Sequence, residues 1–402
     1  MGASEQAVVL ADYFSMKILT VLTYYRPHTS GLTIYVERLA RTLVQLGHEV
    51  TVLTSQYEKD LPREEFVDGV RIVRAPVAFR ISKGVIMPSF GWLAWKLVSS
   101  HDVVHLHLPQ FDAAGVALRG RLLGKPTLIT YHCDLQLPKS TFNRLINLVV
   151  QLMNNLAGVL ADKICAYTDD FASHSPYLQR FAEKVEVIYP PVVMPAVPAE
   201  EVEAFRRQAN PDDRSPVIGM ATRFASEKGV EVLLNALPEV MDRFPDTLVL
   251  YAGQYQDVMG EGAYFDRLHP RIKNYQEGGS WRFLGVLDQR AMAAFYNCLD
   301  LLVVPSLNST ETFGLVQIEA MIQGTPSIAS NLPGVRVPPQ LTGMGEVVPI
   351  GDSEALAETI LKVLSRPDAY RGDPPRVAEI FDPLANAATY EKLYARLEEE
   401  RA

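Results

Sequence analysis

Short apolar runs alternate with amphipathic stretches along most of this chain. The run at 17–23 (KILTVLT) has the composition of a buried parallel strand, and residues 34–47 repeat apolar side chains with helical spacing up to a glycine. A second strand pattern follows at 48–55 (HEVTVLTS). This order of strand, helix and strand predicts a parallel sheet that is covered by helices on both faces.

The alternation continues in two blocks, separated by residues 193–215, where prolines and acidic residues replace any strand pattern. We therefore predict two doubly wound α/β domains that face each other across a cleft. The further strand patterns lie at 69–76, 102–109, 126–132, 163–168 and 185–192 in the first block, and at 216–224, 247–253, 281–287, 301–306 and 325–330 in the second.

The predicted divisions are an N-terminal extension (1–15), a first Rossmann-like domain (16–195), a second Rossmann-like domain (196–380) and a C-terminal helix (381–402). The last segment is heavily charged, so we expect a mostly solvated helix; a return across the first domain is the alternative.

The composition of the chain limits the classes of function that we expect for it. The 402 residues are 48% hydrophobic and 21% charged, which fits globular domains, and the net charge of -9 disfavours a nucleic-acid partner. The three cysteines lie far apart without metal-ligand spacing, which is typical of a reducing compartment, and the N-terminus lacks the features of a signal peptide. No apolar run reaches the roughly 18–20 residues that span a bilayer. We expect a cytoplasmic protein.

Candidate chemistry lies at strand ends in the second block. The loop ATRFASEKG at 221–229 carries Arg223 and Lys228, two cations that can converge on one diphosphate, with ordinary surface positions as the alternative. The segment STETFGLVQIEAMIQG at 309–324 places Gly314 before an apolar helix. Free backbone N–H groups and the positive end of the helix dipole can hold a phosphate there.

Two carboxylates belong to the same segment. Glu311 precedes the helix, and Glu319 lies about one and a half turns inside it, where a carboxylate can hold the diol of a ribose. A helix cap for Glu311 and a solvated face for Glu319 are the alternatives, although the apolar neighbours Ile318 and Ala320 make the second less favourable.

Two loops of the first block carry further candidates. Gly31, in the loop at 24–33, precedes a helix and serves either a ligand or a tight turn. His132 ends a strand in TYHCD (130–134) and serves either a hydrogen bond to a substrate or the structure alone.

Several familiar signatures are absent from the sequence. It contains no G-x-G-x-x-G fingerprint, no G-x-x-x-x-G-K-[ST] phosphate loop, no Ser-His-Asp arrangement and no Asp-x-Asp pair. Without an acidic pair to place a metal on a diphosphate, the protein's own cations and helix dipole would have to neutralise that charge. We therefore expect a site that requires no metal.

Taken together, these segments resemble the retaining glycosyltransferases of family four, which have the GT-B fold. The resemblance covers about residues 16–365, and the Glu-x7-Glu segment with its internal Phe-Gly-Leu, joined in order to the R-F-x-x-x-K-G loop, is a specific combination. The segments that carry it are PHTSGLTIYVERLARTLVQLGHEVTVLT, ATRFASEKGVEVLLNAL, VLYAG, FLGVL and ETFGLVQIEAMIQGTPSIAS.

The resemblance implies a role for each candidate of the second domain. Arg223 and Lys228 would bind the donor diphosphate, and the backbone of Gly314 and Leu315 would donate to phosphate. Glu311 would contact hydroxyls of the donor sugar near the reacting centre.

The remaining implied contacts involve both domains. Glu319 would bind the nucleotide ribose, and Phe313 belongs to the predicted donor-binding set. Gly31 would lie near the donor phosphate and the acceptor, and His132 would contact the donor sugar. The strand at 283–287 would lie near the base. The predicted catalytic groups are Glu311, His132, Arg223 and Lys228.

Two positions depart from the family pattern. Many members have two glycines in the first loop, whereas Ser30 stands before Gly31 here, which would stiffen the loop or shape it for another acceptor. Most members have an Asn-Gly turn after the strand at 185–192, whereas this chain has Pro190 and Pro191, so no role is carried over to this segment.

The implied reaction moves a hexose from a nucleotide-diphosphate sugar, with a UDP-sugar favoured, to a hydroxyl acceptor, and retains the anomeric configuration. No carboxylate is obviously placed for a covalent intermediate, so front-face substitution is expected. The leaving diphosphate would stay bound to Arg223, Lys228 and the helix start.

The acceptor and two rival functions stay open. SFGWLAWKLVSS (89–100) and FNRLINLVVQLMNN (142–155) mix apolar side chains with Lys96 or Arg144, which fits either a membrane interface with a lipid or lipid-linked acceptor, or ordinary helices packed on the sheet. A GT-B nucleotide-sugar epimerase, like UDP-GlcNAc 2-epimerase, would need acid/base carboxylates in both domains. A non-catalytic nucleotide-sugar binding protein would tolerate loss of Glu311.

Overall fold

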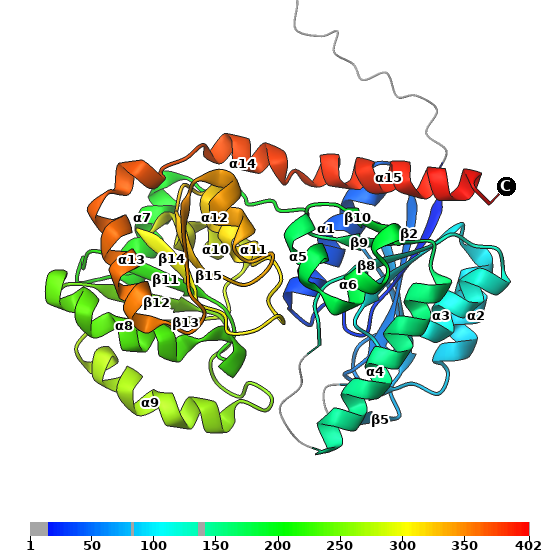
Figure 1. Ribbon diagram of the computed structural model, residues 1–402, viewed down its shortest axis with the longest axis horizontal. Helices are drawn as coiled ribbons and strands as arrows, with labels where there is room; N and C mark the ends of the chain where they lie inside the picture. The colour runs from blue at the N-terminus through cyan, green and yellow to red at the C-terminus, as the bar shows by residue number, and fades with distance from the viewer. Residues whose placement is uncertain (1–14, 82–83, 136–140, 402) are drawn as a thin grey trace, which may run out of the picture.

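The computed structural model describes residues 15–81, 84–135 and 141–401. Within these residues the chain forms two large sheets that stand side by side, each covered by helices on both faces (Figure 1). The predicted N-terminal extension lies outside the described residues, apart from Ser15.

The first sheet contains eight strands within the described residues. They are β1 (Lys17–Val21), β2 (Glu49–Gln56), β3 (Glu64–Val67), β4 (Val70–Pro76), β7 (Val103–Leu108), β8 (Thr127–Tyr131), β9 (Lys163–Ala166) and β10 (Val185–Val187), and their order is β10-β9-β8-β7-β1-β2-β4-β3. All neighbours are parallel except β3, which pairs antiparallel with β4. The predicted parallel sheet therefore has one antiparallel strand at this edge, which the sequence did not indicate because EEFV is a short, largely exposed strand without an apolar run. A separate hairpin joins β5 (Phe79–Ile81) and β6 (Gly84–Ile86).

Successive residues of the strands face opposite layers of the first domain. Ile18 of β1 lies in the core beneath α1 (Gly31–Gln45), whereas its neighbour Leu19 lies in the core on the other side of the sheet. That second core is covered by α2 (Phe90–Ser100), α3 (Ala113–Leu122), α4 (Thr141–Leu160), α5 (Asp169–His174) and α6 (Pro176–Arg180).

Helix α1 begins at Gly31, three residues before the start that the apolar spacing predicts. The reason is a cap: the Ser30 hydroxyl accepts a hydrogen bond from the backbone N–H of Thr33 at 3.2 Å. Ser30 thus fixes where the helix starts.

The second sheet is parallel throughout, with six strands in the described part of the chain. They are β11 (Val217–Ala221), β12 (Leu248–Ala252), β13 (Trp281–Gly285), β14 (Leu301–Val304), β15 (Ser327–Ser330) and β16 (Gly345–Val348), in the order β13-β12-β11-β14-β15-β16. One face is covered by α8 (Val230–Arg243), α9 (Gly262–Glu277) and α13 (Ser353–Ser365), and the other by α7 (Ala199–Ala209), α10 (Gln289–Asn297) and α11 (Leu315–Ile322). A short helix, α12 (Val337–Thr342), precedes β16.

The break between the sheets falls between Val187, the end of β10, and Val217, the start of β11. Helix α7 lies inside the segment that we predict as the junction. The division at 195/196 remains a proposal.

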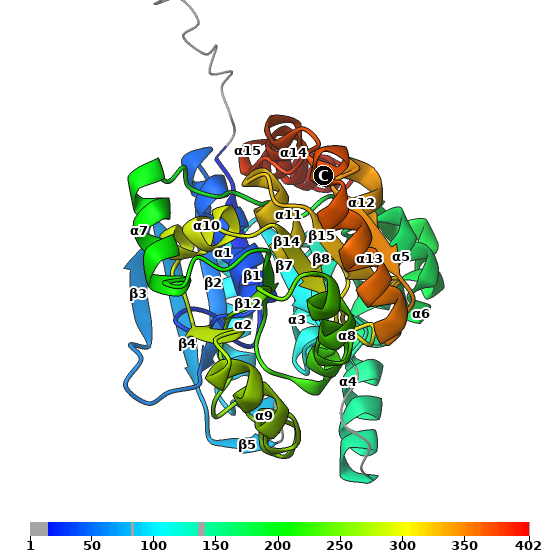
Figure 2. The same cartoon turned by 90° about the vertical axis from the view of Figure 1, so that its left-hand side faces the viewer.

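The C-terminal segment forms α14 (Pro374–Ile380) and α15 (Pro383–Glu399), and α15 lies along α1 of the first domain (Figures 1 and 2). Tyr390 and Tyr394 are fully buried there. The Tyr390 hydroxyl lies 2.6 Å from that of Tyr35, and the Tyr394 hydroxyl lies 2.7 Å from Nδ1 of His105. The expectation of a mostly solvated helix is therefore wrong, because the aromatic side of α15 completes the core of the first domain.

Candidate active site

The carboxyl ends of strands from both sheets meet across the boundary between the domains. Thr312, after β14, donates a hydrogen bond from Oγ1 to the backbone carbonyl of His132, after β8, at 2.6 Å. Asp170, after β9, accepts from the backbone N–H of Gly334 at 2.8 Å and pairs with Arg336 at 2.6 Å. Because doubly wound sheets bind ligands at these strand ends, the boundary between the two domains is the candidate site.

The Asp170–Arg336 pair is a contact that the sequence did not indicate. Burial acts to raise the pKa of Asp170, but the hydrogen bonds from Arg336 and Gly334 outweigh it and lower that pKa below its ordinary value. Asp170 is therefore ionised at neutral pH and ties one end of the two sheets together.

Lys228 and Glu311 form an ion pair on the second domain's side of this boundary. Lys228 Nζ donates to Glu311 Oε2 at 2.6 Å, and the side chains are 15% and 22% exposed. Their loops follow β11 and β14, which are neighbours in the sheet, so the fold brings together two residues that lie 83 positions apart. A lysine and a carboxylate at a partly buried strand end can exchange partners when an anionic ligand arrives.

Gly229 allows these two loops to approach each other. Its φ is +68°, and a Cβ there would lie 2.1 Å from the carbonyl oxygen of Pro305. A second tie joins the loops, because the backbone N–H of Leu307 donates to the carbonyl of Glu227 at 2.9 Å. Only glycine combines this left-handed backbone with so close a contact.

We expect Gly229→Ala to destabilise the protein by about 3 kcal/mol, because the new methyl group must displace the Pro305 loop and the left-handed backbone disfavours alanine. Urea denaturation followed by circular dichroism measures this free energy. Gly31→Ala is the matched control, since a Cβ at Gly31 would meet no atom within 4 Å, and its stability should change by less than about 1 kcal/mol. Equal stabilities of the two variants would contradict the argument.

The start of α11 has the geometry expected of an anion-binding helix terminus. Gly314 caps the helix with φ 74° and ψ 70°, and Leu315 is the first helical residue. In the first turn the N–H of Gln317 donates to the Gly314 carbonyl at 2.9 Å, and the N–H groups of Leu315 and Val316, which precede this first helical hydrogen bond, lie at the positive end of the helix dipole. The phosphate roles of Gly314 and Leu315 remain proposals that this geometry allows.

Phe313, next to Gly314 in the chain, is a buried core residue. Its side chain is 1% exposed and packs against Tyr167 and Phe381. The side chain therefore belongs to the core that joins the two domains and is not available to a donor in this structure.

The sequence suggests that Arg223 and Lys228 converge on one anion, but in the structure they pair with two different carboxylates. The half-exposed guanidinium of Arg223 pairs with Glu227 in its own loop, while Lys228 pairs with Glu311. Arg223 nonetheless lies near the first domain, because its charge adds to burial in lowering the pKa of His28, in the loop after β1.

The loop after β8 faces the same groups. Burial raises the pKa of the Cys133 thiol to about 12, and the charges that act on it are Asp134, then Lys228, Glu311 and Arg223. The cations and the carboxylate of the second domain therefore lie opposite the His132 loop of the first.

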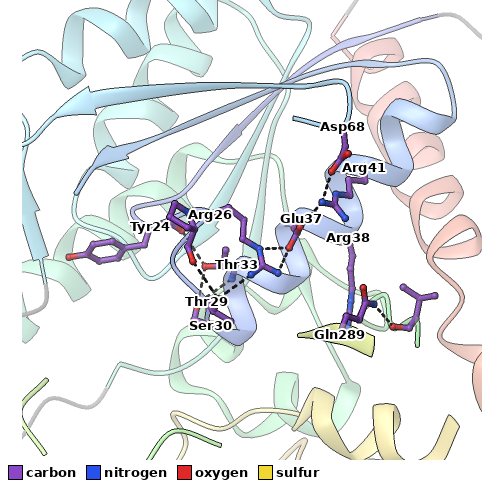
Figure 3. A network of polar contacts seen from close by, with 12 residues as sticks. Tyr24, Arg26, Thr29, Ser30, Thr33, Glu37, Arg38, Arg41, Asp68 and Gln289 are labelled. Atoms are coloured by element: carbon purple, nitrogen blue, oxygen red, sulfur yellow. Dashed lines mark hydrogen bonds and ion pairs between the residues drawn. The ribbon is translucent and has the colours of Figure 1, made fainter. Parts of the chain in front are cut away.

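The loop at Gly31 is held by a polar network rather than by a strained turn. Arg26 pairs with Glu37 on α1, Arg41 also pairs with Glu37 at 2.9 Å, and Arg41 reaches Asp68 (Figure 3). Gly31 itself needs no left-handed backbone and has open space where a Cβ would lie. The tight-turn alternative is therefore not required, and a ligand role for Gly31 remains a proposal.

His132 is part of a buried chain of side chains. Its Nε2 lies 2.9 Å from Nδ1 of His107, and its Nδ1 is hydrogen-bonded to the Tyr167 hydroxyl. Burial, with a smaller effect of His105, lowers the pKa of His132 to about 3, so the ring is neutral at neutral pH. Both nitrogens already have partners, so the proposed contact with a donor sugar requires the ring to exchange one of them.

Glu319 is buried, so the solvated-face alternative is wrong. Its Oε1 accepts from Arg38 at 2.7 Å and its Oε2 accepts from the Tyr296 hydroxyl at 2.9 Å. Arg38 lies on α1, so this ion pair is a further tie between the domains, beside those made by Thr312 and Asp170. Nothing in the sequence distinguished Arg38 from the other basic residues of that helix. A ribose would have to share this carboxylate, and the ribose role remains a proposal.

Neither a metal centre nor a membrane span occurs in the described part of the chain. No group of three or more His, Cys, Asp or Glu side chains there could hold a metal ion. None of the described helices combines the length and the apolar character needed to cross a bilayer.

Comparison with known proteins identifies the family to which this chain is similar. The model described as "Glycosyltransferase Family 4" matches residues 29–194, and the model described as "Glycosyl transferases group 1" matches residues 201–372. A 2-deoxystreptamine glucosyltransferase of Streptomyces kanamyceticus is 28% identical, over 84% of this chain and 90% of the relative. A phosphatidyl-myo-inositol mannosyltransferase of Mycolicibacterium smegmatis is 25% identical, over 90% of this chain and 89% of the relative.

Solved structures share the fold. HepE of Anabaena, in complex with UDP-glucose, superposes with a TM-score of 0.74 at 18% identity, covering 95% of this chain and 100% of that one. Sucrose-phosphate synthase of Thermosynechococcus elongatus superposes with a TM-score of 0.72 at 24% identity, covering 95% and 99%. The two family models adjoin and together span most of both domains, so the chain belongs to the family-four glycosyltransferases, enzymes of the GT-B fold that use nucleotide-sugar donors.

Proposed function

We propose that this enzyme transfers a hexose from a UDP-sugar to a hydroxyl acceptor, with retention of the anomeric configuration and without a metal ion. The observation that carries the proposal is the Lys228–Glu311 pair, because Glu311 lies only three residues before Gly314 and the start of α11. Positive charge, a carboxylate and backbone N–H donors thus occur together at the ends of two neighbouring strands, opposite the loops of the first domain.

The pair has a defined part in the proposed reaction. When the donor binds, Lys228 exchanges Glu311 for the diphosphate, and Glu311 becomes free to accept hydrogen bonds from hydroxyls of the donor sugar. Arg223 is exposed enough to leave Glu227 and add a second cation.

In the transfer step the bond between the anomeric carbon and the diphosphate oxygen breaks, and the bond to the acceptor oxygen forms on the same face. The proton of the acceptor hydroxyl passes to the leaving diphosphate. Negative charge grows on that diphosphate, so Lys228, Arg223 and the helix start bind the transition state more strongly than the ground state.

Relatives guide the choice of substrates. A glucosyltransferase and mannosyltransferases are among them, which supports a hexose, and HepE, which has the same fold, binds UDP-glucose. The mycobacterial relatives act on phosphatidyl-myo-inositol, so we propose a lipid or lipid-linked acceptor, with the enzyme at the cytoplasmic surface of a membrane.

The proposal is tested with a panel of nucleotide sugars, first by thermal shift and then by nucleotide release with and without candidate acceptors. We expect release to need acceptor, to change less than about twofold in EDTA, and to give a product with the donor's anomeric configuration by NMR. Activity that vanished on chelation and returned with magnesium would contradict the metal-independent site. Conversion of the donor to an epimer without acceptor would favour the epimerase alternative.

A further inference from the structure

Three neighbouring helices leave an unusually apolar outer surface on the first domain. Helix α3 lies between α2 and α4, and all three cover the same side of the first sheet (Figure 1). They carry nine of the twenty large hydrophobic side chains that are exposed in the described part of the chain. We call their outer surface the α2–α4 face.

Helix α4 contributes a continuous stripe to this face. Leu145, Leu148, Leu152, Leu156 and Val159 are all exposed, and their spacing of three or four residues places them on one side of the helix. The stripe is about 21 Å long at 1.5 Å per residue. The other side of the helix is already used, because Ala157 and Asn154 are buried against the domain. Packing on the sheet therefore does not account for the exposed leucines.

The neighbouring helices extend the apolar surface with side chains suited to an interface. Trp92 and Trp95 are exposed on α2, and Leu118 and Leu122 are exposed on α3. Tryptophan favours the boundary between water and lipid, where its ring is buried and its N–H can still meet a polar partner. The ammonium of Lys96 lies over the ring of Trp92, 5.8 Å from the ring centroid.

The charge of these helices is opposite to that of the whole protein. The chain has a net charge of -9, yet α2, α3 and α4 contain no aspartate or glutamate. Their ionised groups are all basic: Lys96, Arg119, Arg121 and Arg144. A second copy of the chain, docked face to face, would bring these cations together, whereas an anionic surface would neutralise them.

We propose that the α2–α4 face docks on the anionic surface of a lipid bilayer, with the stripe of α4 and the two tryptophans inserted among the lipids and the four cations near the headgroups. This inference rests on the proposed function in one respect, since it supplies the place where a lipid-linked acceptor would be met. Helix α4 follows the loop after β8, so Leu145, with Arg144 beside it, is the residue of the stripe closest in the chain to the candidate site.

Flotation with vesicles tests the proposal on the full-length protein. Wild-type protein should float with vesicles of phosphatidylcholine and phosphatidylglycerol, but not with phosphatidylcholine alone, and less so at high salt. The chain has three tryptophans, and Trp281 is buried, so a blue shift of fluorescence or quenching by brominated lipid reports on Trp92 and Trp95.

Two variants and a matched control assign the binding to this face. Leu148→Ser/Leu152→Ser should lower the partition coefficient at least tenfold, and each charge reversal among Lys96, Arg121 and Arg144 at least about fivefold. Leu341→Ser/Leu384→Ser changes two exposed leucines elsewhere and should float like wild type.

Three results would overturn the proposal: no flotation of the wild type with anionic vesicles, flotation that the face variants leave unchanged, or a dimer by light scattering that the Leu148→Ser/Leu152→Ser variant converts to monomer. Nucleotide release from a soluble donor and acceptor is measured on the same preparations. Release without flotation rejects the docking surface alone, whereas flotation without release rejects the proposed reaction.

Discussion

Lys228→Ala is expected to lower kcat/KM by about a thousandfold while the protein stays folded. In the proposed mechanism Lys228 holds the charge that develops on the leaving diphosphate, and its loss removes an interaction that is strongest in the transition state. The loss should therefore appear mainly in kcat, with a smaller change in KM, because the start of α11 and Arg223 still bind the donor. Steady-state kinetics with the best donor of the panel measures both constants.

Lys362 provides the matched control for this variant. It also forms an ion pair of 2.6 Å, with Glu346, but on the exposed surface of α13 in the same domain. Lys362→Ala should leave kcat/KM within about twofold of wild type, because Lys362 lies outside the proposed donor site. The fold should also be unaffected, since exposed ion pairs contribute little to stability. Lys228→Arg should recover part of the activity. A Lys228→Ala enzyme within tenfold of wild type would remove this lysine from the mechanism.

Tyr390→Ala should destabilise the protein by about 4 kcal/mol, the largest stability effect that we expect from a single side chain of α15. Tyr390 is fully buried between α15 and α1, and its hydroxyl lies 2.6 Å from that of Tyr35 and 3.1 Å from Thr130 Oγ1. Truncation leaves a cavity and two hydroxyls with fewer partners. Urea denaturation with circular dichroism and tryptophan fluorescence measures the change.

Two variants separate the possible causes of that destabilisation. Tyr390→Phe keeps the ring and loses only the hydroxyl, so we expect about 1 kcal/mol. Leu384→Ala, at an exposed position of the same helix, should change the stability by less than about 0.5 kcal/mol. If Tyr390→Ala changed the free energy of unfolding as little as Leu384→Ala, the packing of α15 would not contribute to the stability of the first domain.

Local sequence patterns were sufficient to predict which loops carry the candidate site residues. The apolar strand before Arg223 and the glycine before the helix at 315 are short-range patterns, and each marks a strand end with its chemistry. The partners of those groups could not be predicted in this way. Lys228 meets Glu311, and Arg38 meets Glu319, only because loops and helices far apart in sequence are brought together.

The histidines illustrate the same limit. His132 could be singled out as a residue at a strand end, but the sequence alone left its role open between ligand and structure. In the structure its two nitrogens are occupied by His107 and Tyr167, and burial keeps it neutral. Which neighbours surround a buried ring is a property of the packed core, and no local pattern encodes it.

By itself, then, the sequence determined the alternation of strands and helices, the two-domain architecture and the loops that carry charge, because each depends on the residues within one turn or one strand. The tertiary structure decided which charges pair, which face of α15 is buried, and which apolar residues of α2, α3 and α4 stay in contact with water. These properties depend on how the sheets and helices pack, so they exist only once distant segments of the chain share one core and one surface.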